Sequence, residues 1–356
     1  MKKTIFILFP AFISFYTAYC QPASVRQDSL LAHMQAAIEK DSYTGIHSVL
    51  IAKGDRLIYE HYFNGFGRDT LHDSRSSFKS ITSLLIGIAI DQGLIKSVQD
   101  KVYSFFPEYA GSGSLDERKK KMTIQNLLEM RSGYDCEEFQ DTKNCEGDMT
   151  ETPDWVKFSL DLPMKDQPGT VWAYTSCDPM ILSGIIRQVA HMPIMDFARR
   201  YLFGPMGITQ YRWTVDPAGN GMTAGSFYIP PADMIKIGCL VKNKGVWNGK
   251  RIVSEKWIEE STRTPIVIPD FSFVQFSKTD LAVPQPTHYG YYWYTELIKA
   301  KDYGQEVLFA SGNGGQYIMI FKNLDLVVVF TQGNYNSWKA KRAFDILVRY
   351  ILPVYE

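Results

Sequence analysis

The chain lacks both a net charge and a long hydrophobic run, and these absences narrow its class. Over 356 residues, 38 Lys and Arg balance 38 Asp and Glu. No basic stripe therefore indicates a nucleic-acid partner, and no acidic block indicates a disordered tail. Neither internal repeats nor low-complexity tracts are visible. The hydrophobic fraction of 45% is typical of a globular protein able to bury a core, in one large or two medium domains.

Several catalytic signatures are also missing. No Gly-x-Ser-x-Gly elbow occurs, which argues against an α/β-hydrolase nucleophile. The six histidines form no His-Glu-x-x-His pair, which argues against that kind of zinc site. No glycine-rich loop ends in Gly-Lys-Ser/Thr, so nothing indicates phosphate binding. We therefore expect chemistry that depends on neither a metal nor an organic cofactor.

The N-terminus has the features of a targeting segment. A positive start at Met1–Lys3 precedes an apolar stretch from Thr4 to Phe15, which is too short to span a bilayer comfortably. Residues 17–21 are a plausible cleavage region, so residues 1–20 are predicted to be a signal peptide. The expected product is exported, periplasmic or secreted. Cys20 leaves lipidation as an alternative, and only then would a membrane be a partner.

Export makes disulfides possible. Cys136 and Cys145 flank a polar loop, residues 137–144, and could close it. Cys177 and Cys239 lie in segments that look ordered and buried, where a small buried thiol is the simpler interpretation. The sequence says nothing of the oligomeric state.

Hydrophobic periodicity predicts helices and strands in separate groups. Strands are predicted at 47–52, 57–63, 306–310, 316–321 and 326–332, and helices at 26–40, about 76–93, 123–130, 180–190, 231–240 and 337–352. The two strand groups can complete one hydrophobic core only together. This predicts an α+β fold in which helices from both ends of the chain flank an antiparallel sheet. Residues 21–94 and 235–356 would form that domain and residues 95–234 a mainly helical inserted domain, with the active site at their interface.

Ser76 and Lys79 begin the apolar run that continues to Gly93. Residues at i and i+3 share one face of a helix, so Lys79 would lie beside the Ser76 hydroxyl. A serine hydroxyl is a poor nucleophile without a base, and a lysine can serve when burial or a nearby cation lowers its pKa. A serine three residues before a lysine also arises by chance, so the rest of the chain must support the assignment.

Two further segments offer partners for this pair. Tyr174 and Ser176 follow a Pro168-Gly169 turn, in a stretch that we expect to be extended, so that both side chains point the same way. A tyrosine can act as a base if a lysine cation stabilises its phenolate, although most tyrosines are packing residues. Gly312, Asn313, Gly314 and Gly315 precede a predicted strand. Such a segment can aim a backbone N–H at an oxyanion, or it can simply be a bend between two strands.

Taken in this order, Ser-x-x-Lys, Tyr-x-Ser and a glycine-rich strand entry resemble the motif set of the penicillin-recognising serine hydrolases, the serine beta-lactamase-like superfamily. The resemblance covers about residues 45–335 and includes the segments 127–134, 204–208 and 245–253. It is greatest toward the family C esterases and the 6-aminohexanoate-dimer hydrolases.

The resemblance implies a role for each matched residue. Ser76 would be the acylated nucleophile and Lys79 its partner. Tyr174 would act first as general base and then as acid to the leaving group. The backbone N–H groups of Ser76 and Gly315 would form the oxyanion hole, supported by Ser176, Gly312, Asn313 and Gly314.

Two departures from the family pattern bear on the substrate. Ser176 stands where many members have asparagine, and Gly312 stands where a lysine or histidine usually begins the third motif. That cation helps to bind the carboxylate of beta-lactams and D-alanyl peptides. We therefore expect an exported serine hydrolase that acts on a neutral ester or small amide. A beta-lactamase or D-alanyl peptidase, and a non-catalytic acylatable sensor or binding protein, remain alternatives. The aromatic residues Trp172, Tyr289 and 291–293 would line an acyl pocket or, more simply, pack in the core.

Overall fold

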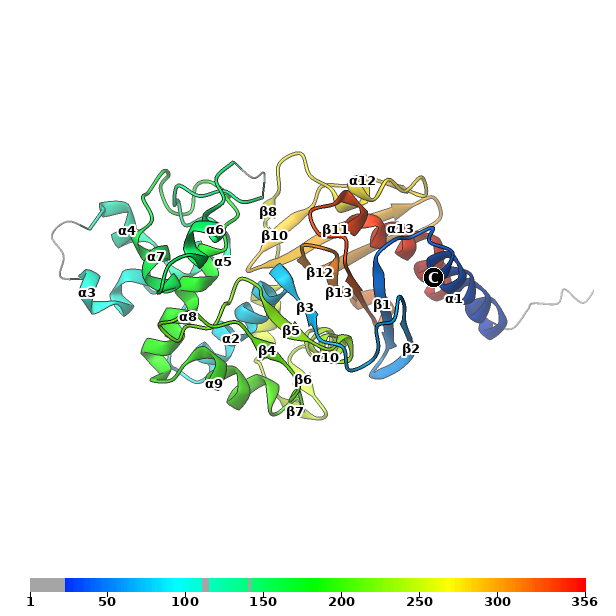
Figure 1. The fold of residues 1–356 in the computed structure, drawn as a ribbon, viewed down its shortest axis with the longest axis horizontal. Helices are drawn as coiled ribbons and strands as arrows, with labels where there is room; N and C mark the ends of the chain where they lie inside the picture. The colour runs from blue at the N-terminus through cyan, green and yellow to red at the C-terminus, as the bar shows by residue number, and fades with distance from the viewer. Residues whose placement is uncertain (1–22, 111–114, 140–141) are drawn as a thin grey trace, which may run out of the picture.

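A nine-stranded antiparallel sheet forms the centre of the molecule in the computed structural model, which describes residues 23–110, 115–139 and 142–356 (Figure 1). The strand order is β2-β1-β14-β13-β12-β11-β10-β8, with β9 beside β11. These strands are β1 (Ile46–Lys53), β2 (Arg56–Tyr62), β8 (Ile266–Val267), β9 (Ala282–Val283), β10 (His288–Gly290), β11 (Trp293–Ala300), β12 (Gly304–Gly312), β13 (Gln316–Phe321) and β14 (Leu326–Gln332).

Short strands and many helices complete the fold. A three-stranded sheet contains β3 (His72–Asp73), β5 (Phe227–Ile229) and β4 (Arg212–Trp213), and β6 (Val246–Trp247) pairs with β7 (Lys250–Arg251). The α-helices are α1 (Ala23–Glu39), α2 (Phe78–Asp91), α3 (Pro107–Ala110), α4 (Glu117–Lys121), α5 (Ile124–Leu128), α6 (Cys145–Thr150), α7 (Trp155–Asp161), α8 (Cys177–Ala190), α9 (Ile194–Ala198), α10 (Pro231–Lys242), α11 (Glu255–Ser261), α12 (Phe273–Ser277), α13 (Ala343–Ile346) and α14 (Leu352–Tyr355).

The central strands are buried on both faces, which explains why they are apolar runs rather than alternating patterns. On one face, Phe344 of α13 packs with Phe309 and Tyr317, at centroid distances of 5.4 and 5.7 Å. On the other face, α10 approaches so closely that a Cβ on Gly238 would lie 2.4 Å from Val327 Cγ1. Gly238 is therefore required by the packing between helix and sheet.

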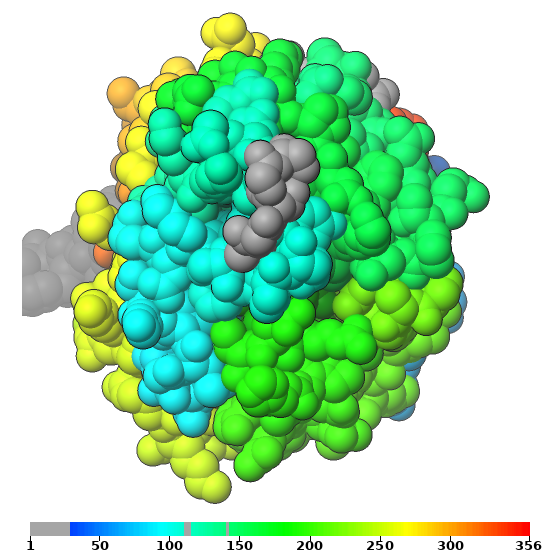
Figure 2. All heavy atoms as spheres, turned by 90° about the vertical axis from the view of Figure 1, so that its left-hand side faces the viewer, coloured from blue at the N-terminus to red at the C-terminus, as the bar shows by residue number. Residues whose placement is uncertain are grey.

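The helices between α3 and α9 gather at one end of the molecule, beyond α2 (Figure 1). Helix α8 packs against α2, α5, α6, α7 and α9, so it is the centre of this helical part. Figure 2 looks at that end, where segments coloured from cyan to green cover most of the surface. The part of the chain that the structure describes contains no helix long and apolar enough to cross a membrane.

The predicted α+β fold is confirmed, and β1 pairs with β14 as the joint core requires. Two expectations were wrong or incomplete. The closing helix predicted at 337–352 is divided into a 3-10 turn (Trp338–Arg342), α13, a π-helical turn (Leu347–Ile351) and α14. Pro353 in α14 has no N–H, which interrupts the regular helical hydrogen bonds there. Strands β10 and β11 were not predicted. The proposed domain boundaries stay predictions, and the signal segment and Cys20 lie outside the described residues.

Candidate active site

Ser76 lies in a tight 3-10 turn, Arg75–Ser77, that leads directly into α2. The turn is strained, because Arg75 has a φ of +47°. Its backbone N–H donates to Asp73 Oδ1 at 2.9 Å, which holds this conformation. A Cβ on Gly312 would lie 2.4 Å from the Ser74 carbonyl oxygen, so only glycine lets the end of β12 reach the turn. Ser76 itself is half-buried and therefore accessible from one side.

Lys79 is the buried cation of the site, with a side chain that is fully enclosed. Its Nζ donates to Ser76 Oγ at 2.9 Å, to the Ala224 carbonyl at 2.8 Å and to Ser176 Oγ at 3.4 Å. Burial, with a smaller contribution from the neighbouring Arg75, lowers the pKa of Lys79 to about 8. Glu146 and Glu138 oppose this shift. Near neutral pH a useful fraction of Lys79 is therefore neutral and able to accept a proton.

Tyr174 lies on the other side of the same lysine. Lys79 Nζ is 4.8 Å from the centre of the Tyr174 ring. The phenol hydroxyl is hydrogen-bonded to the side chains of Ser76 and Tyr294. Burial raises the pKa of Tyr174 well above its ordinary value. The hydroxyl therefore stays protonated through the neutral range, where it can donate a proton but does not readily accept one.

Ser176 is the residue that precedes α8, and it has helical backbone angles (φ −75°, ψ −15°) rather than the expected extended ones. Its side chain still reaches Lys79, so the structure brings Ser76, Lys79, Tyr174 and Ser176 together. The backbone N–H of Ser176 donates to Glu138 Oε2 at 2.9 Å.

Two carboxylates that the sequence analysis missed complete this arrangement. Glu138 Oε2 and Glu146 Oε2 lie 2.8 and 3.1 Å from Ser176 Oγ. Glu138 follows Cys136 by two residues and Glu146 follows Cys145 by one, and these cysteines form a disulfide with a Cα–Cα distance of 6.0 Å. The two cysteines themselves were the available signal, since a bridge between them fixes the acidic residues beside each end of the loop.

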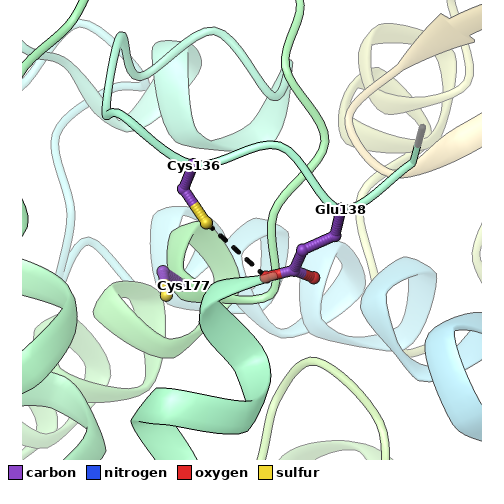
Figure 3. Close-up of side chains that lie close together, drawn as sticks. All are labelled: Cys136, Glu138 and Cys177. Carbon is purple, nitrogen blue, oxygen red and sulfur yellow. Dashed lines mark hydrogen bonds between the residues drawn. The ribbon is translucent and has the colours of Figure 1, made fainter. Parts of the chain in front are cut away.

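Cys136, Glu138 and Cys177 form the group of possible metal ligands in the described residues, with ligand atoms within 4.8 Å of one another (Figure 3). The Cys136 sulfur is already bonded to Cys145, so it is not available as a thiolate. Burial raises the pKa of the Cys177 thiol far above its ordinary value, which makes it inert. Neither cysteine therefore suits a metal site in this state.

The glycine-rich segment is the turn between β12 and β13 rather than only a strand entry. Gly314 and Gly315 have φ values of +88° and +97°, which favour glycine. Asn313 is clamped by two hydrogen bonds to Asn336. The Gly315 N–H donates to the Gly312 carbonyl at 3.0 Å. This differs from the expected oxyanion-hole role, because the donor is already used inside the turn.

The aromatic residues divide into a core set and a rim set. Tyr289, 291–293 and Tyr294 are buried, as core packing requires. Trp172 is only partly buried and packs with Phe139 at 5.2 Å, which in turn packs with Phe271 at 4.8 Å. Phe139 also lies 5.8 Å from the Tyr174 ring. These three aromatic residues give the site an apolar side next to Tyr174.

This fold is that of the serine beta-lactamase-like superfamily. The chain belongs to the Beta-lactamase family, whose model matches residues 33–349. It is 24% identical over 252 residues to the 6-aminohexanoate-dimer hydrolase of Paenarthrobacter ureafaciens, a match that covers 66% of this chain and 62% of that relative. The chain therefore spans less than two thirds of that protein's length.

Solved structures have the same fold at low sequence identity. A beta-lactamase-like protein from Bacteroides dorei, described as a putative beta-lactamase, superposes with a TM-score of 0.70 at 17% identity, covering 91% of this chain and 98% of that one. A family VIII carboxylesterase superposes with a TM-score of 0.67 at 17% identity, covering 93% and 98%. At 17% identity, both solved structures show that this chain shares their fold.

Proposed function

We propose that the protein is a serine hydrolase that forms an acyl-enzyme at Ser76 and acts on an ester or a small amide. The observation that carries this proposal is the 2.9 Å contact between Ser76 Oγ and a buried lysine whose pKa is lowered to about 8. A neutral amine at hydrogen-bond distance is the base that a serine hydroxyl needs in order to attack a carbonyl.

In this mechanism the roles of base and acid differ from the sequence expectation. Neutral Lys79 takes the Ser76 proton as Oγ bonds to the substrate carbonyl carbon. The protonated Tyr174 then donates its proton to the leaving oxygen or nitrogen as that bond breaks, and Lys79 returns a proton to Tyr174. Deacylation follows the same steps in reverse order. Tyr174 passes its proton to Lys79 and takes a proton from the water that attacks the acyl carbon, and Lys79 then returns a proton to Ser76 Oγ as the ester bond breaks. The raised pKa of Tyr174 keeps its hydroxyl protonated, the form that a proton donor needs. The lowered pKa of Lys79 gives a fraction of neutral amine, the form that a base needs.

The oxyanion would be stabilised chiefly by the backbone N–H of Ser76 in its strained turn. The Gly315 N–H would join it only by sharing or breaking its bond to Gly312. A neutral substrate fits the charges around Ser76, because Glu138 and Glu146 lie behind Lys79 and Arg75 is paired with Asp73 at 3.6 Å. The names of the relatives, an esterase and a 6-aminohexanoate-dimer hydrolase, support the same choice.

The test is turnover of p-nitrophenyl acetate and butyrate by the mature protein beside Ser76→Ala. We expect turnover by the wild type and its loss in Ser76→Ala, together with loss of covalent labelling by an organophosphonate. Labelling that persists in Ser76→Ala would refute the nucleophile. Labelling of the wild type without turnover would instead favour a sensor or binding protein.

A beta-lactamase or D-alanyl peptidase activity is the second candidate. It is favoured by the structural likeness to the Bacteroides dorei protein and by Arg75, whose Cβ lies 3.1 Å from the position of a Cβ on Gly312. The Arg75 side chain thus starts beside the place where the family lysine is missing. Rapid, saturable hydrolysis of nitrocefin would support this candidate, and none at millimolar concentration would exclude it.

We also propose that the protein is exported after cleavage near residue 20. The disulfide between Cys136 and Cys145 supports an oxidising compartment. Mass spectrometry of the N-terminus in fractionated cells would distinguish a free mature chain from a lipid-modified Cys20. An uncleaved cytoplasmic chain would contradict the proposal.

A further inference from the structure

One hydroxyl group at Ser176 lies within hydrogen-bond distance of two carboxylates. Glu138 Oε2 is 2.8 Å and Glu146 Oε2 is 3.1 Å from Ser176 Oγ, and Lys79 Nζ also points at this oxygen from 3.4 Å. A hydroxyl has a single proton, so it can donate to only one of the two carboxylates. The second carboxyl group must carry a proton of its own. Otherwise two negatively charged carboxylates would face the same hydroxyl oxygen and repel each other.

Glu138 is held more firmly than Glu146. Its Oε2 also accepts the Ser176 N–H at 2.9 Å, and its Oε1 accepts the Thr175 hydroxyl at 3.2 Å. Burial nevertheless raises the pKa of Glu138, an effect to which Glu146 adds and which Lys79 opposes. The contacts of both carboxyl groups with one hydroxyl therefore favour a pair that holds one proton between its two members.

The groups that face the pair and Lys79 come from several elements. They are Arg75 from the Arg75–Ser77 turn, Tyr174 from the segment before α8, and Cys177 and Asp178 from α8. Burial raises the pKa values of Tyr174, Cys177 and Asp178, which favours the neutral form of each. The charge of the pair is therefore the main variable negative charge near Lys79.

We propose that Glu138 and Glu146 share one proton across Ser176 and act as positioning residues that set the protonation of Lys79. The inference deepens the proposed function, since it rests on Lys79 being the base. One shared proton leaves a single negative charge, which holds Ser176 and Lys79 in place without fixing a full proton on the lysine. Two free charges would keep Lys79 protonated to a higher pH.

The test compares Glu138→Gln, Glu146→Gln and the double variant by the pH dependence of kcat/KM between pH 5.5 and 9.5. Either single variant removes the shared proton but leaves one negative charge. The acid limb, meaning the rise of kcat/KM with pH as Lys79 loses its proton, should therefore move by less than about 0.3 pH unit. The double variant removes the last charge, so the limb should move down by about one unit, the usual effect of one close charge. Glu151→Gln, on an exposed position at the end of α6, is the matched control.

Two results would overturn the inference. Equal shifts in the single variants that add in the double variant would mean two separate charges. An unmoved limb in the double variant would mean that the pair does not act on Lys79.

A measurement without turnover separates this inference from the proposed function. In protein labelled with 13C-lysine and 13C-glutamate, NMR titration reads Lys79 and the two carboxyl groups directly. One carboxyl of the pair should remain protonated at pH 7 in the wild type, and the lysine should titrate lower only in the double variant. Two ionised carboxylates at pH 7 would overturn the inference whether or not any ester is hydrolysed. An NMR result as expected in a protein without turnover would overturn the proposed function alone.

Discussion

Lys79 determines what the proposed site can do, because a buried lysine has to be stabilised by every group around it. Three acceptors contact its Nζ, namely Ser76, Ala224 and Ser176, and the cost of burying the charge lowers its pKa to about 8. A lysine with an ordinary pKa would remain protonated and could stabilise charge, but it could not accept the serine proton. In the proposed mechanism the environment, rather than the residue type, would thus make Lys79 a base.

The pH dependence of turnover should follow this lysine. As the pH rises through about 8, the neutral fraction of Lys79 grows, so kcat/KM for p-nitrophenyl butyrate should rise and then level off. Initial rates corrected for spontaneous hydrolysis would measure the limb. If the Tyr174 phenolate were the base, the rise would come only at much higher pH. A flat profile from pH 6 to 9 would contradict both assignments.

Tyr174→Phe tests the proton donor. The change keeps the ring beside Lys79 but removes the hydroxyl that is bonded to Ser76, so turnover should fall by at least ~10²-fold. The loss should be smaller for esters of acidic phenols, which leave without protonation, than for an amide. Tyr294→Phe, which removes the other hydroxyl that interacts with Tyr174, is the comparison variant and should lower turnover much less. Equal losses for all leaving groups would assign Tyr174 a structural role.

At this scale the sequence predicted some residues well and could not predict others. Ser76 and Lys79 are three residues apart on one turn, so their contact follows from local geometry. Tyr174 needed the resemblance, because nothing local separates it from other tyrosines. Glu138 and Glu146 were missed because their positions depend on a disulfide and on the start of α8, which a pattern of single residues does not contain.

At the scale of elements, the structure shows why one strand pair escaped prediction. The hairpin between β10 and β11 turns on two residues, Tyr291 and Tyr292, which have φ values of +40° and +70°. Two-residue hairpins with both φ values positive normally contain Asn-Gly or Gly-Gly, and this one offers two aromatic residues instead. Ser80 Oγ donates to the Tyr292 carbonyl at 2.6 Å, so α2 contributes to holding the turn. The hairpin is therefore fixed by tertiary contacts.

The loop closed by Cys136 and Cys145 is the second element that tertiary constraint places. It carries Glu138 at one end and Glu146 just beyond the other, and both reach Ser176. The bridge spans nine residues of sequence, so its entropic effect on the unfolded chain is modest. Its larger effect should be local, because it holds the two carboxyl groups close to one hydroxyl.

Replacement of both cysteines by serine should separate these two effects. The free energy of unfolding should fall by up to ~3 kcal/mol, the amount for a short closed loop, as measured by urea denaturation. The acid limb of kcat/KM should also move, because the carboxyl pair is released from Ser176. A reductant should reproduce both changes in the wild type and have no further effect on the double serine variant. A reductant effect on that variant would show that the change does not arise from this bridge.

At the scale of the whole molecule, the first and last strands of the described chain pair with each other in one sheet. Strand β1 pairs with β14 from Ile46↔Gln332 to Lys53↔Leu326, so the first and last strands depend on each other. The sequence analysis predicted this closure from the need for one core, and the structure confirms it. The short sheet of β3, β5 and β4 lies next to the Arg75–Ser77 turn, since the Ser74 N–H donates to the Phe227 carbonyl at 2.8 Å.

Two histidines occupy this junction and should make it sensitive to acid. His47 on β1 and His72 on β3 both pack on Phe66, at 3.8 and 5.1 Å, and their rings are 5.4 Å apart. Burial lowers the pKa of each to about 4, and each histidine has one buried ring nitrogen without a hydrogen-bond partner among the described residues. Protonation would place two unpaired cations side by side, one within β1 and the other three residues before the Arg75–Ser77 turn.

Acid should therefore loosen the molecule here before it unfolds elsewhere. Between pH 6.5 and 4, His47 and His72 bind protons in the unfolded chain but not in the folded state. The free energy of unfolding therefore falls as the pH falls through this range. In His47→Gln/His72→Gln that part of the slope should vanish, whereas His33→Gln, on an exposed position of α1, should retain it. Urea denaturation at half-unit pH steps measures the slope for each chain. Equal slopes in the wild type and the double variant would show that the histidines titrate freely, and the acid lability would then have to arise from another part of the fold.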